Sequence, residues 1–503
     1  MSRHLLERSP IVALALAISL SAYVAGADPQ AAALPEHRDW RALEAPLLTQ
    51  HVRLTDPAMF DKAGEAYFSP DGSWIIFQAV PVPPEGEAPS PHYLMYVAKL
   101  AIDDRGLVTG LENEPMLLSP PGSANTCGWF HPLYPWKVMF GSTLVPPAAP
   151  DQPGFQVGTR RYVWAFPEEM TIVQRSVPEI WFDLNMRDEP KPELLPVTTP
   201  DFGRDATEPV PIFIRDGYDA EGSWSSCGRF ILYTHAAAAD PHARPDGDLW
   251  LYDHDTDTHT PLIIEPGYDG GPFFSTDDRL ITYRSDRAGD NKLQLFISIL
   301  AKDKATGAIT GVEREIQITD DGHVNWAPYF HPDAGMDERD RPRGVVAYTS
   351  SRSGHDNYEL FALSIDRVAV GAQRASAVMP RRLTFAEGFD GLGVFSPCAT
   401  RFMWTSQRHD DGQPGRGSSQ LWIAQLATDA DPAGPLDERQ AELLAILEAE
   451  IDEMDVRGAQ AEAEAFGRDW FVTVRPSAEV RGRARVYRVR PDGSASRVER
   501  DTP

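Results

Sequence analysis

The chain has little cysteine, with 3 in 503 residues: Cys127, Cys227 and Cys398. They form no CxxC pair and no even-numbered set, so the sequence indicates neither a zinc ribbon nor a disulfide scaffold. We expect all three to be small buried residues. The sequence also has no phosphate-binding Walker loop, no HExxH helix and no GxSxG nucleophile elbow. It therefore predicts no catalytic residue of these common enzyme classes.

Long apolar runs are equally scarce. One candidate is IVALALAISLSAYVAG, which follows Arg3 and Arg8 and ends at a small-residue site, Ala25 to Ala27. This order is typical of a secretory signal, and we predict cleavage before Asp28 and a periplasmic or secreted protein. The run is short and rich in alanine, so we expect no transmembrane span after cleavage; an uncleaved anchor is the alternative.

Basic residues are outnumbered by acidic ones, and the formal net charge is −27. Such a surface repels phosphate backbones and anionic lipid, which argues against nucleic acid as a partner. It favours cationic partners or divalent ions.

One pattern recurs six times: a short apolar strand, a tight turn rich in Ser, Pro, Asp and Gly, and a second strand of alternating residues. The copies are GEAYFSPDGSWIIFQA (64–79), NTCGWFHPLYPWKVMFGS (125–142), DAEGSWSSCGRFILYTH (219–235), DGGPFFSTDDRLITYRSD (269–286), NWAPYFHPD with GVVAYTSSR (325–333, 344–352) and GLGVFSPCATRFMWTS (391–406). A third strand follows each copy: YLMYVA, EIWFDL, DLWLYD, LQLFIS, YELFAL and QLWIAQL. Fourth strands such as REIQIT and PRRLT precede the next copy. The sequence thus predicts an all-β, six-bladed β-propeller of four-stranded antiparallel blades.

The ring needs a closing strand. HVRLTD (51–56) looks like a fourth strand that stands before the first copy, and nothing equivalent follows QLWIAQL. We predict that Val52 to Leu54 complete the sixth blade, which would cover the last free sheet edges. The first and sixth copies would then be neighbours in the ring.

The repeat, FSPDGxxIxF followed by SxR and an LY, LW or LF strand, resembles the TolB-type propeller repeats of exported bacterial proteins. Those are related to the propellers of prolyl oligopeptidases and dipeptidyl peptidases. The resemblance covers about residues 50–426 and implies a TolB-like envelope role. The copies depart from the pattern in places: His131 and His331 occupy the serine position of the turn.

Four regions are expected along the chain: a signal peptide (1–27), a lead-in (28–48), the propeller (49–426) and a C-terminal appendage (427–503). In the appendage, a linker precedes LDERQAELLAILEAEIDEM, whose leucines recur at helical spacing, and the strands WFVTV and RARVYRVR form an Arg-rich β element. Within the second blade, 144–179 is expected to be an insertion containing TRRYVWAF, which could serve as a lid or docking loop.

A candidate site emerges from the alignment of the copies. Six residues before the serine position stand Ala63, Asn125, Asp219, Asp269, Asn325 and Asp390. This position enters the innermost strand, so the last five are predicted to ring one mouth of the central channel as a site for Ca²⁺, Mg²⁺ or a cationic group. The alternative is structural, since Asn and Asp are also favoured at turns.

Two other patterns suggest metal binding. DHDTDTH (253–259) places Asp at alternate positions, but it lacks the glycine and the final glutamate of a calcium loop, so we interpret it as a hairpin. The oligogalacturonide lyases, propeller enzymes of related architecture, bind a catalytic metal through several histidines, and His131, His235, His323 and His331 lie near blade turns. Their positions differ between copies, and a ring nitrogen of His131 or His331 could replace the serine hydroxyl in the turn.

The leading hypothesis is an exported, non-enzymatic and monomeric propeller that binds a protein, peptide or envelope polymer across one face. The alternative is a metal-dependent lyase or hydrolase that acts on an oligosaccharide or peptide at the channel mouth.

Overall fold

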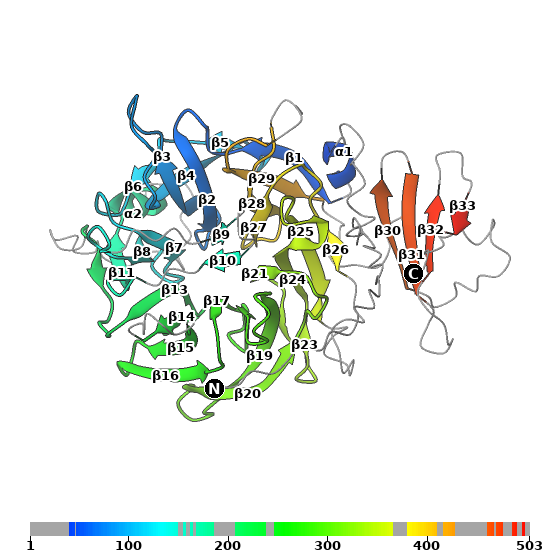
Figure 1. The fold of residues 1–503 in the computed structure, drawn as a ribbon. Helices are drawn as coiled ribbons and strands as arrows, with labels where there is room; N and C mark the ends of the chain where they lie inside the picture. Colours follow the sequence, from blue (N-terminus) through cyan, green and yellow to red (C-terminus); the bar gives the residue numbers. More distant parts are fainter. Residues whose placement is uncertain are drawn as a thin grey trace, which may run out of the picture. The chain divides into compact units, whose positions relative to one another are not determined.

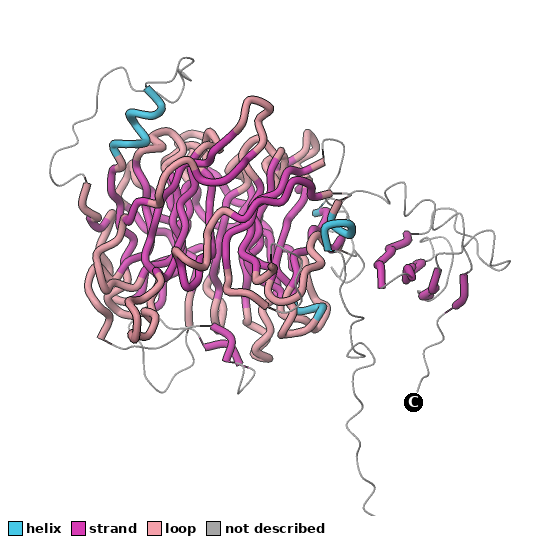
Figure 2. Tube along the Cα trace, turned by 90° about the horizontal axis from the view of Figure 1, so that it is seen from above, coloured by secondary structure: helices cyan, strands magenta, loops and turns pink. Residues whose placement is uncertain are grey.

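The computed structural model describes residues 40–45, 47–148, 154–156, 161–163, 167–185, 207–237, 246–365, 380–409, 416–427, 460–466, 469–475, 485–489 and 495–497. Six antiparallel sheets form the blades of a β-propeller (Figure 1). Viewed after a 90° turn, the strands run between two layers of loops (Figure 2). The predicted fold class is confirmed.

The blades follow one another along the chain, each with its innermost strand first. Blade one comprises β2 (Phe60–Phe68), β3 (Trp74–Pro81), β4 (Leu94–Ile102), β5 (Val108–Leu111) and β6 (Met116–Leu117). Blade two comprises β7 (Asn125–Phe130), β8 (Lys137–Ser142), β11 (Thr171–Ser176) and β12 (Val210–Pro211). Blade three comprises β13 (Tyr218–Trp224), β14 (Phe230–Ala236), β15 (Asp248–Asp253) and β16 (Thr258–Ile263). Blade four comprises β17 (Asp269–Phe274), β18 (Leu280–Ser285), β19 (Gln294–Lys302) and β20 (Ile309–Gln317). Blade five comprises β21 (Asn325–Phe330), β24 (Val345–Ser350), β25 (Glu359–Ser364) and β26 (Arg381–Arg382). Blade six comprises β27 (Asp390–Phe395), β28 (Arg401–Ser406), β29 (Gln420–Leu426) and β1 (Leu48–Arg53).

The closing strand is confirmed. β1 pairs with β29 in antiparallel register, from Leu48 opposite Leu426 to Arg53 opposite Trp422. The amide of Leu54 adds a hydrogen bond of 2.8 Å to the carbonyl of Leu421. β1 begins earlier than predicted, and a short helix, α1 (Trp40–Glu44), precedes it. The end of the predicted lead-in therefore belongs to the folded propeller.

The third strand of the second blade was predicted wrongly. EIWFDL lies in helix α2 (Pro178–Asn185), and the strand is TIVQRS, in β11. A proline at the first helical position and a glutamate in the first turn favour helix there. Ile180, Trp181 and Leu184 are buried at helical rather than alternate spacing. The insertion is thus shorter than predicted, and it contains the hairpin of β9 (Gly154–Gln156) and β10 (Arg161–Val163).

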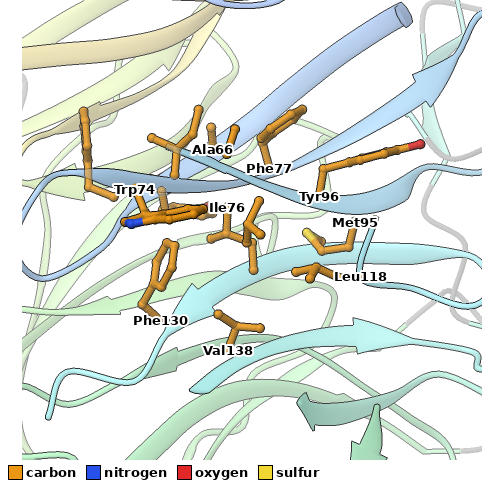
Figure 3. Packing of buried hydrophobic residues seen from close by; sticks show 14 of the residues in the cluster. Ala66, Trp74, Ile76, Phe77, Met95, Tyr96, Leu118, Phe130 and Val138 are labelled. Carbon is orange, nitrogen blue, oxygen red and sulfur yellow. The ribbon is translucent and has the colours of Figure 1, made fainter. Parts of the chain in front are cut away.

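The core lies between neighbouring blades. Second strands are buried on both sides, as in β3, where seven consecutive residues from Trp74 are buried. Figure 3 shows Ile76 of blade one packed towards Phe130 and Val138 of blade two, whereas Phe77 lies on the opposite side of the strand, next to Tyr96. A side chain at Gly128 would come within 2.5 Å of Ile76, so the inner strand of blade two needs a glycine to approach blade one this closely.

Hydrogen bonds within the blade turns explain why serine recurs at one position of each turn. In the serine copies the hydroxyl accepts the amide at the start of the second strand, as Ser69 Oγ does from Trp74 at 2.9 Å. His131 Nδ1 accepts the amides of Leu133 and Tyr134 at 3.1 and 3.2 Å. His331 Nδ1 accepts from Asp333 at 3.3 Å. The ring nitrogens thus bond the turn, as predicted, but they accept amides two or three residues further on instead of the amide at the start of the second strand.

This role of His131 predicts a pH dependence of stability. Burial, with the charges of Lys137 and His254, lowers the pKa of His131 to about 4 from 6.5. The unfolded chain therefore takes up a proton below about pH 6.5 while the folded protein does not, so stability is lost as the pH falls from about 6.5 to 4. This contribution is at most about 3 kcal/mol. In urea denaturation, His131→Ser should remove this part of the pH dependence.

His131→Ala is the matched control, because it removes the titration and also the acceptor. It should be less stable than His131→Ser at pH 7. A His131→Ser protein whose stability falls with pH as steeply as that of the wild type would contradict the assignment.

The C-terminal part contains a separate four-stranded antiparallel sheet of β30 (Gln460–Phe466), β31 (Asp469–Arg475), β32 (Arg485–Val489) and β33 (Ala495–Arg497). β31 and β32 are the two predicted strands, and the other two were not predicted. The predicted helix between 436 and 454 and the predicted signal peptide lie outside the described residues. Among the described helices, none is long and apolar enough to cross a membrane.

The expected burial of the cysteines was wrong. Cys227 and Cys398 are exposed, and Cys127 is partly exposed. Cys227 lies in the turn between β13 and β14, and Cys398 lies in the turn between β27 and β28. Both belong to what we call the turn face, which carries the turns between the first and second strands. The opposite face, where the innermost strands begin, is called the mouth face.

Candidate functional site

The five predicted ring residues lie at the start of innermost strands on the mouth face. All are buried: the exposed fraction is 5% for Asn125, 1% for Asp219, 0% for Asp269, 0% for Asn325 and 1% for Asp390. Each stands opposite the end of the second strand of its own blade, at Ser142, His235, Ser285, Ser350 and Ser406 respectively.

Their side chains bind protein groups. Asp219 Oδ1 lies 2.8 Å from His235 Nδ1, Arg287 donates to Asp269 at 3.1 Å, and Arg408 donates to Asp390 at 2.9 Å. Ser350 Oγ donates to Asn325 at 2.7 Å, and Asn125 donates to the carbonyl of Tyr93 at 3.0 Å. The arginines come from the SxR motif of blades four and six. These contacts account for the recurrence of Asn and Asp by pairing at the end of the second strand.

Two carboxylate oxygens in this ring are not satisfied. Oδ2 of Asp219 and Oδ2 of Asp269 are buried without a hydrogen-bond partner. Across the described part of the chain, however, no three His, Cys, Asp or Glu side chains are grouped so that they could hold a metal ion. The metal site therefore stays a prediction.

The four histidines of the rival hypothesis are not brought together. His131 and His331 lie in turns of the turn face, His235 pairs with Asp219 near the mouth face, and His323 precedes β21. DHDTDTH forms the hairpin between β15 and β16, with Asp253 opposite Thr258, as predicted. Asp253 accepts two hydrogen bonds from Arg229 at 2.9 and 2.7 Å.

A second ring, which the sequence analysis missed, lies two residues further along. The pairing of every innermost strand with its second strand shifts by a β-bulge, and one residue in each bulge has a positive φ. These residues are Glu65 (42°), Cys127 (49°), Glu221 (58°), Gly271 (57°), Ala327 (49°) and Leu392 (57°). A bulge re-aims a side chain, so alternation along the strand does not by itself decide which of these residues face the channel.

Glu65, Cys127 and Glu221 carry the polar chemistry of this bulge ring. The Cys127 thiol, from blade two, donates to Oε1 of Glu65, from blade one, at 3.0 Å. Tyr67 OH donates to the same oxygen at 3.0 Å. Burial raises the pKa of the Glu65 carboxyl, although the Cys127 hydrogen bond and the charge of Arg284 oppose this effect. Burial also raises the pKa of the Cys127 thiol, so it is a hydrogen-bond donor here and not a nucleophile.

The charge of Glu221 is compensated by Arg284 of blade four. Glu221 accepts hydrogen bonds from Tyr268 OH, the amide of Gly271 and Arg284 Nη2, the last at 3.1 Å. Blade four has glycine in its bulge because a side chain on Gly271 would come within 2.1 Å of Arg284 Nη1. The guanidinium thus occupies the space that other blades give to a bulge side chain.

An aromatic layer lies next to the bulge ring. It consists of Tyr67, Trp129, Phe273 and Tyr329, each two residues after the bulge residue of blades one, two, four and five. All six pairs of these rings are in contact, with centroid separations from 4.8 Å (Tyr67 to Trp129) to 6.3 Å (Trp129 to Tyr329). Side chains from four blades can meet in this way only across the axis, so the layer fills the channel.

The sequence contains a pattern for both the bulge ring and the aromatic layer. The aligned copies contain one column with Glu65, Cys127 and Glu221 and another with Tyr67, Trp129, Phe273 and Tyr329. What the alignment lacked was the bulge, which decides which column faces the axis.

The chain was compared with known proteins. No protein-family model matches it, and no curated protein matches its sequence. Solved structures similar to it include TolB from Acinetobacter baumannii, with 13% identity, a TM-score of 0.39 and coverage of 72% of this chain and 65% of that one. A TolB-type protein of Agrobacterium tumefaciens has 14% identity, a TM-score of 0.39 and coverage of 76% and 99%.

An oligogalacturonate lyase of Vibrio parahaemolyticus is also similar, with 11% identity, a TM-score of 0.38 and coverage of 76% of this chain and 94% of that one. This chain spans less than two thirds of the Acinetobacter structure. The chain is a six-bladed β-propeller, and TolB-type propellers are among the solved structures similar to it.

Proposed function

We propose that the chain is an exported, non-enzymatic propeller that binds a protein, peptide or envelope polymer across the mouth face. The observation that carries this proposal is a channel filled by the aromatic layer beside a polar bulge ring. Glu65 and Cys127 are partly exposed, whereas Glu221 is 8% exposed and already paired. A filled channel conducts nothing, but it offers a ligand a polar surface backed by apolar rings, which is typical of binding sites.

Photo-crosslinking tests which face is used. Ala288 is exposed in the loop between β18 and β19, on the mouth face, and Cys398 is exposed on the turn face. A benzoylphenylalanine at position 288 should crosslink a discrete partner in an envelope extract, and the same residue at position 398 should not. Equal adducts from both positions, or adducts only from 398, would overturn the proposal.

A divalent cation at the mouth face is the second candidate, and with it the metal-dependent lyase or hydrolase. The unsatisfied Oδ2 atoms of Asp219 and Asp269 favour it, because a buried carboxylate oxygen without a hydrogen-bond donor is a possible ligand for a cation. Calorimetric titration with Ca²⁺, Mg²⁺ and Mn²⁺ tests it. Binding that disappears in a folded Asp219→Asn/Asp269→Asn protein would support a metal site, and no heat in the wild type would leave both residues structural.

A further inference from the structure

Glu65 differs from the other acids around the axis in forming no ion pair with a basic side chain of the described residues, although the charge of Arg284 acts on it through space. Arg284 neutralises Glu221, Arg287 pairs with Asp269, and Arg408 pairs with Asp390. The side-chain donors to Glu65 within the described residues are the Cys127 thiol and the Tyr67 hydroxyl, which carry no charge. A partly buried carboxylate held only by neutral donors gains free energy from an added cation.

The Glu65 carboxylate is also fixed in place. Its backbone amide donates to Thr405 Oγ1 of blade six at 3.1 Å, and its φ is 42°. Both side-chain hydrogen bonds from the described residues end on Oε1, so within this part of the chain Oε2 keeps its lone pairs for a ligand. A pre-positioned acceptor loses little conformational entropy when a ligand binds.

The surroundings favour an organic cation over a metal ion. Ca²⁺ takes six to eight oxygen ligands, and no suitable group of side chains is found in the described part of the chain. Tyr67 joins Glu65 to the aromatic layer, in which Trp129 and Tyr329 are partly exposed. Aromatic faces attract ammonium and guanidinium groups and pack well against their aliphatic stems.

We propose that Glu65 and the aromatic layer bind a lysine or arginine side chain of the partner polypeptide. This inference rests on the proposed function, since it gives the chemistry of the partner for the same face. The formal charge of −27 would draw a basic segment towards the protein, and Glu65 would receive one cationic group of that segment.

The test is calorimetric titration of the full chain with the blocked peptide acetyl-Gly-Lys-Gly-amide. The wild type should bind it at least tenfold more tightly than the same peptide with an acetylated lysine. Glu65→Gln should weaken binding at least tenfold, because glutamine accepts the Cys127 and Tyr67 hydrogen bonds but has no charge. Glu85→Gln, which removes an exposed acid elsewhere, should leave the affinity unchanged.

Trp129→Phe is a second variant, which should weaken binding of the lysine peptide severalfold. If Glu65→Gln does not fold, this variant and the acetyl-lysine comparison together test the inference. Equal affinity for both peptides, or equal effects of the Glu65 and Glu85 variants, would overturn the inference. If crosslinking from position 288 persists in that case, the mouth face is right and the cation recognition is wrong. If both fail, the proposed function fails too.

Discussion

Arg408→Met should lower the free energy of unfolding by about 3–5 kcal/mol, the cost of breaking a buried ion pair from one side. Arg408 is 4% exposed and donates to both oxygens of Glu44 at 2.9 and 3.0 Å, as well as to Asp390 at 2.9 Å. Its guanidinium also lies 4.2 Å from the ring centroid of Trp40. Without the arginine, two carboxylates would remain close together in the interior.

These ion pairs join two segments that are far apart in the sequence. Glu44 ends helix α1, just before the closing strand, whereas Arg408 and Asp390 belong to blade six. Burial would raise the pKa of Glu44, but Arg408 and His51 hold it below its ordinary value, so the carboxylate is charged. The buried pairs therefore tie the N-terminal segment to the blade that it completes.

Arg341→Met is the matched control, because Arg341 forms an exposed ion pair with Asp337 at 2.8 Å and its loss should cost at most about 1 kcal/mol. Guanidinium chloride denaturation measures both variants. The triple change Glu44→Gln, Asp390→Asn and Arg408→Met should recover much of the lost stability. Equal stability losses for the two arginine variants would show that the buried network does not hold the closure.

Phe273→Ala should cost about 3–5 kcal/mol, as expected for removing a packed aromatic side chain. Phe273 is 9% exposed and contacts Tyr67, Trp129 and Tyr329 at centroid distances of 5.6, 5.4 and 5.2 Å. Its removal would take one of four rings from the aromatic layer and leave a cavity on the axis.

Phe182→Ala provides the comparison, since Phe182 in helix α2 is 52% exposed and its truncation should cost less than about 1 kcal/mol. Phe273→Leu should lie between the two. Thermal and denaturant unfolding measure all three. A Phe273→Ala loss no larger than that of Phe182→Ala would mean that the channel is not filled as described.

The propeller could be predicted from the sequence because each blade buries its strands in the same way and so repeats the same apolar pattern. The closing strand was visible for the same reason, as a fourth strand without a blade. The third strand of the second blade was predicted wrongly because EIWFDL resembles the third strands DLWLYD and QLWIAQL in sequence, whereas its helical burial pattern is evident only from the structure. Helix α1 has five residues, too few for a periodic signal.

The site was harder to predict than the fold. Asp269 and Asp390 were predicted to be site residues because acids recur at their position in the copies. In the structure these two acids pair with Arg287 and Arg408. Glu65 and Cys127 occupy bulges, where a left-handed residue changes the direction of the side chain. No alternation rule gives the position of a bulge, so which column faces the axis required the structure.

The most direct test of the account is to block each face in turn. In a protein that keeps the unreactive Cys127 but lacks Cys227 and Cys398, a bulky maleimide label is attached either to Ala288→Cys on the mouth face or to Cys398 restored on the turn face. The affinity for the partner captured by crosslinking is then measured. The account predicts at least a tenfold loss with the label at 288 and no change with the label at 398. Unchanged affinity with the label at 288, or a loss confined to 398, would contradict binding at the mouth face.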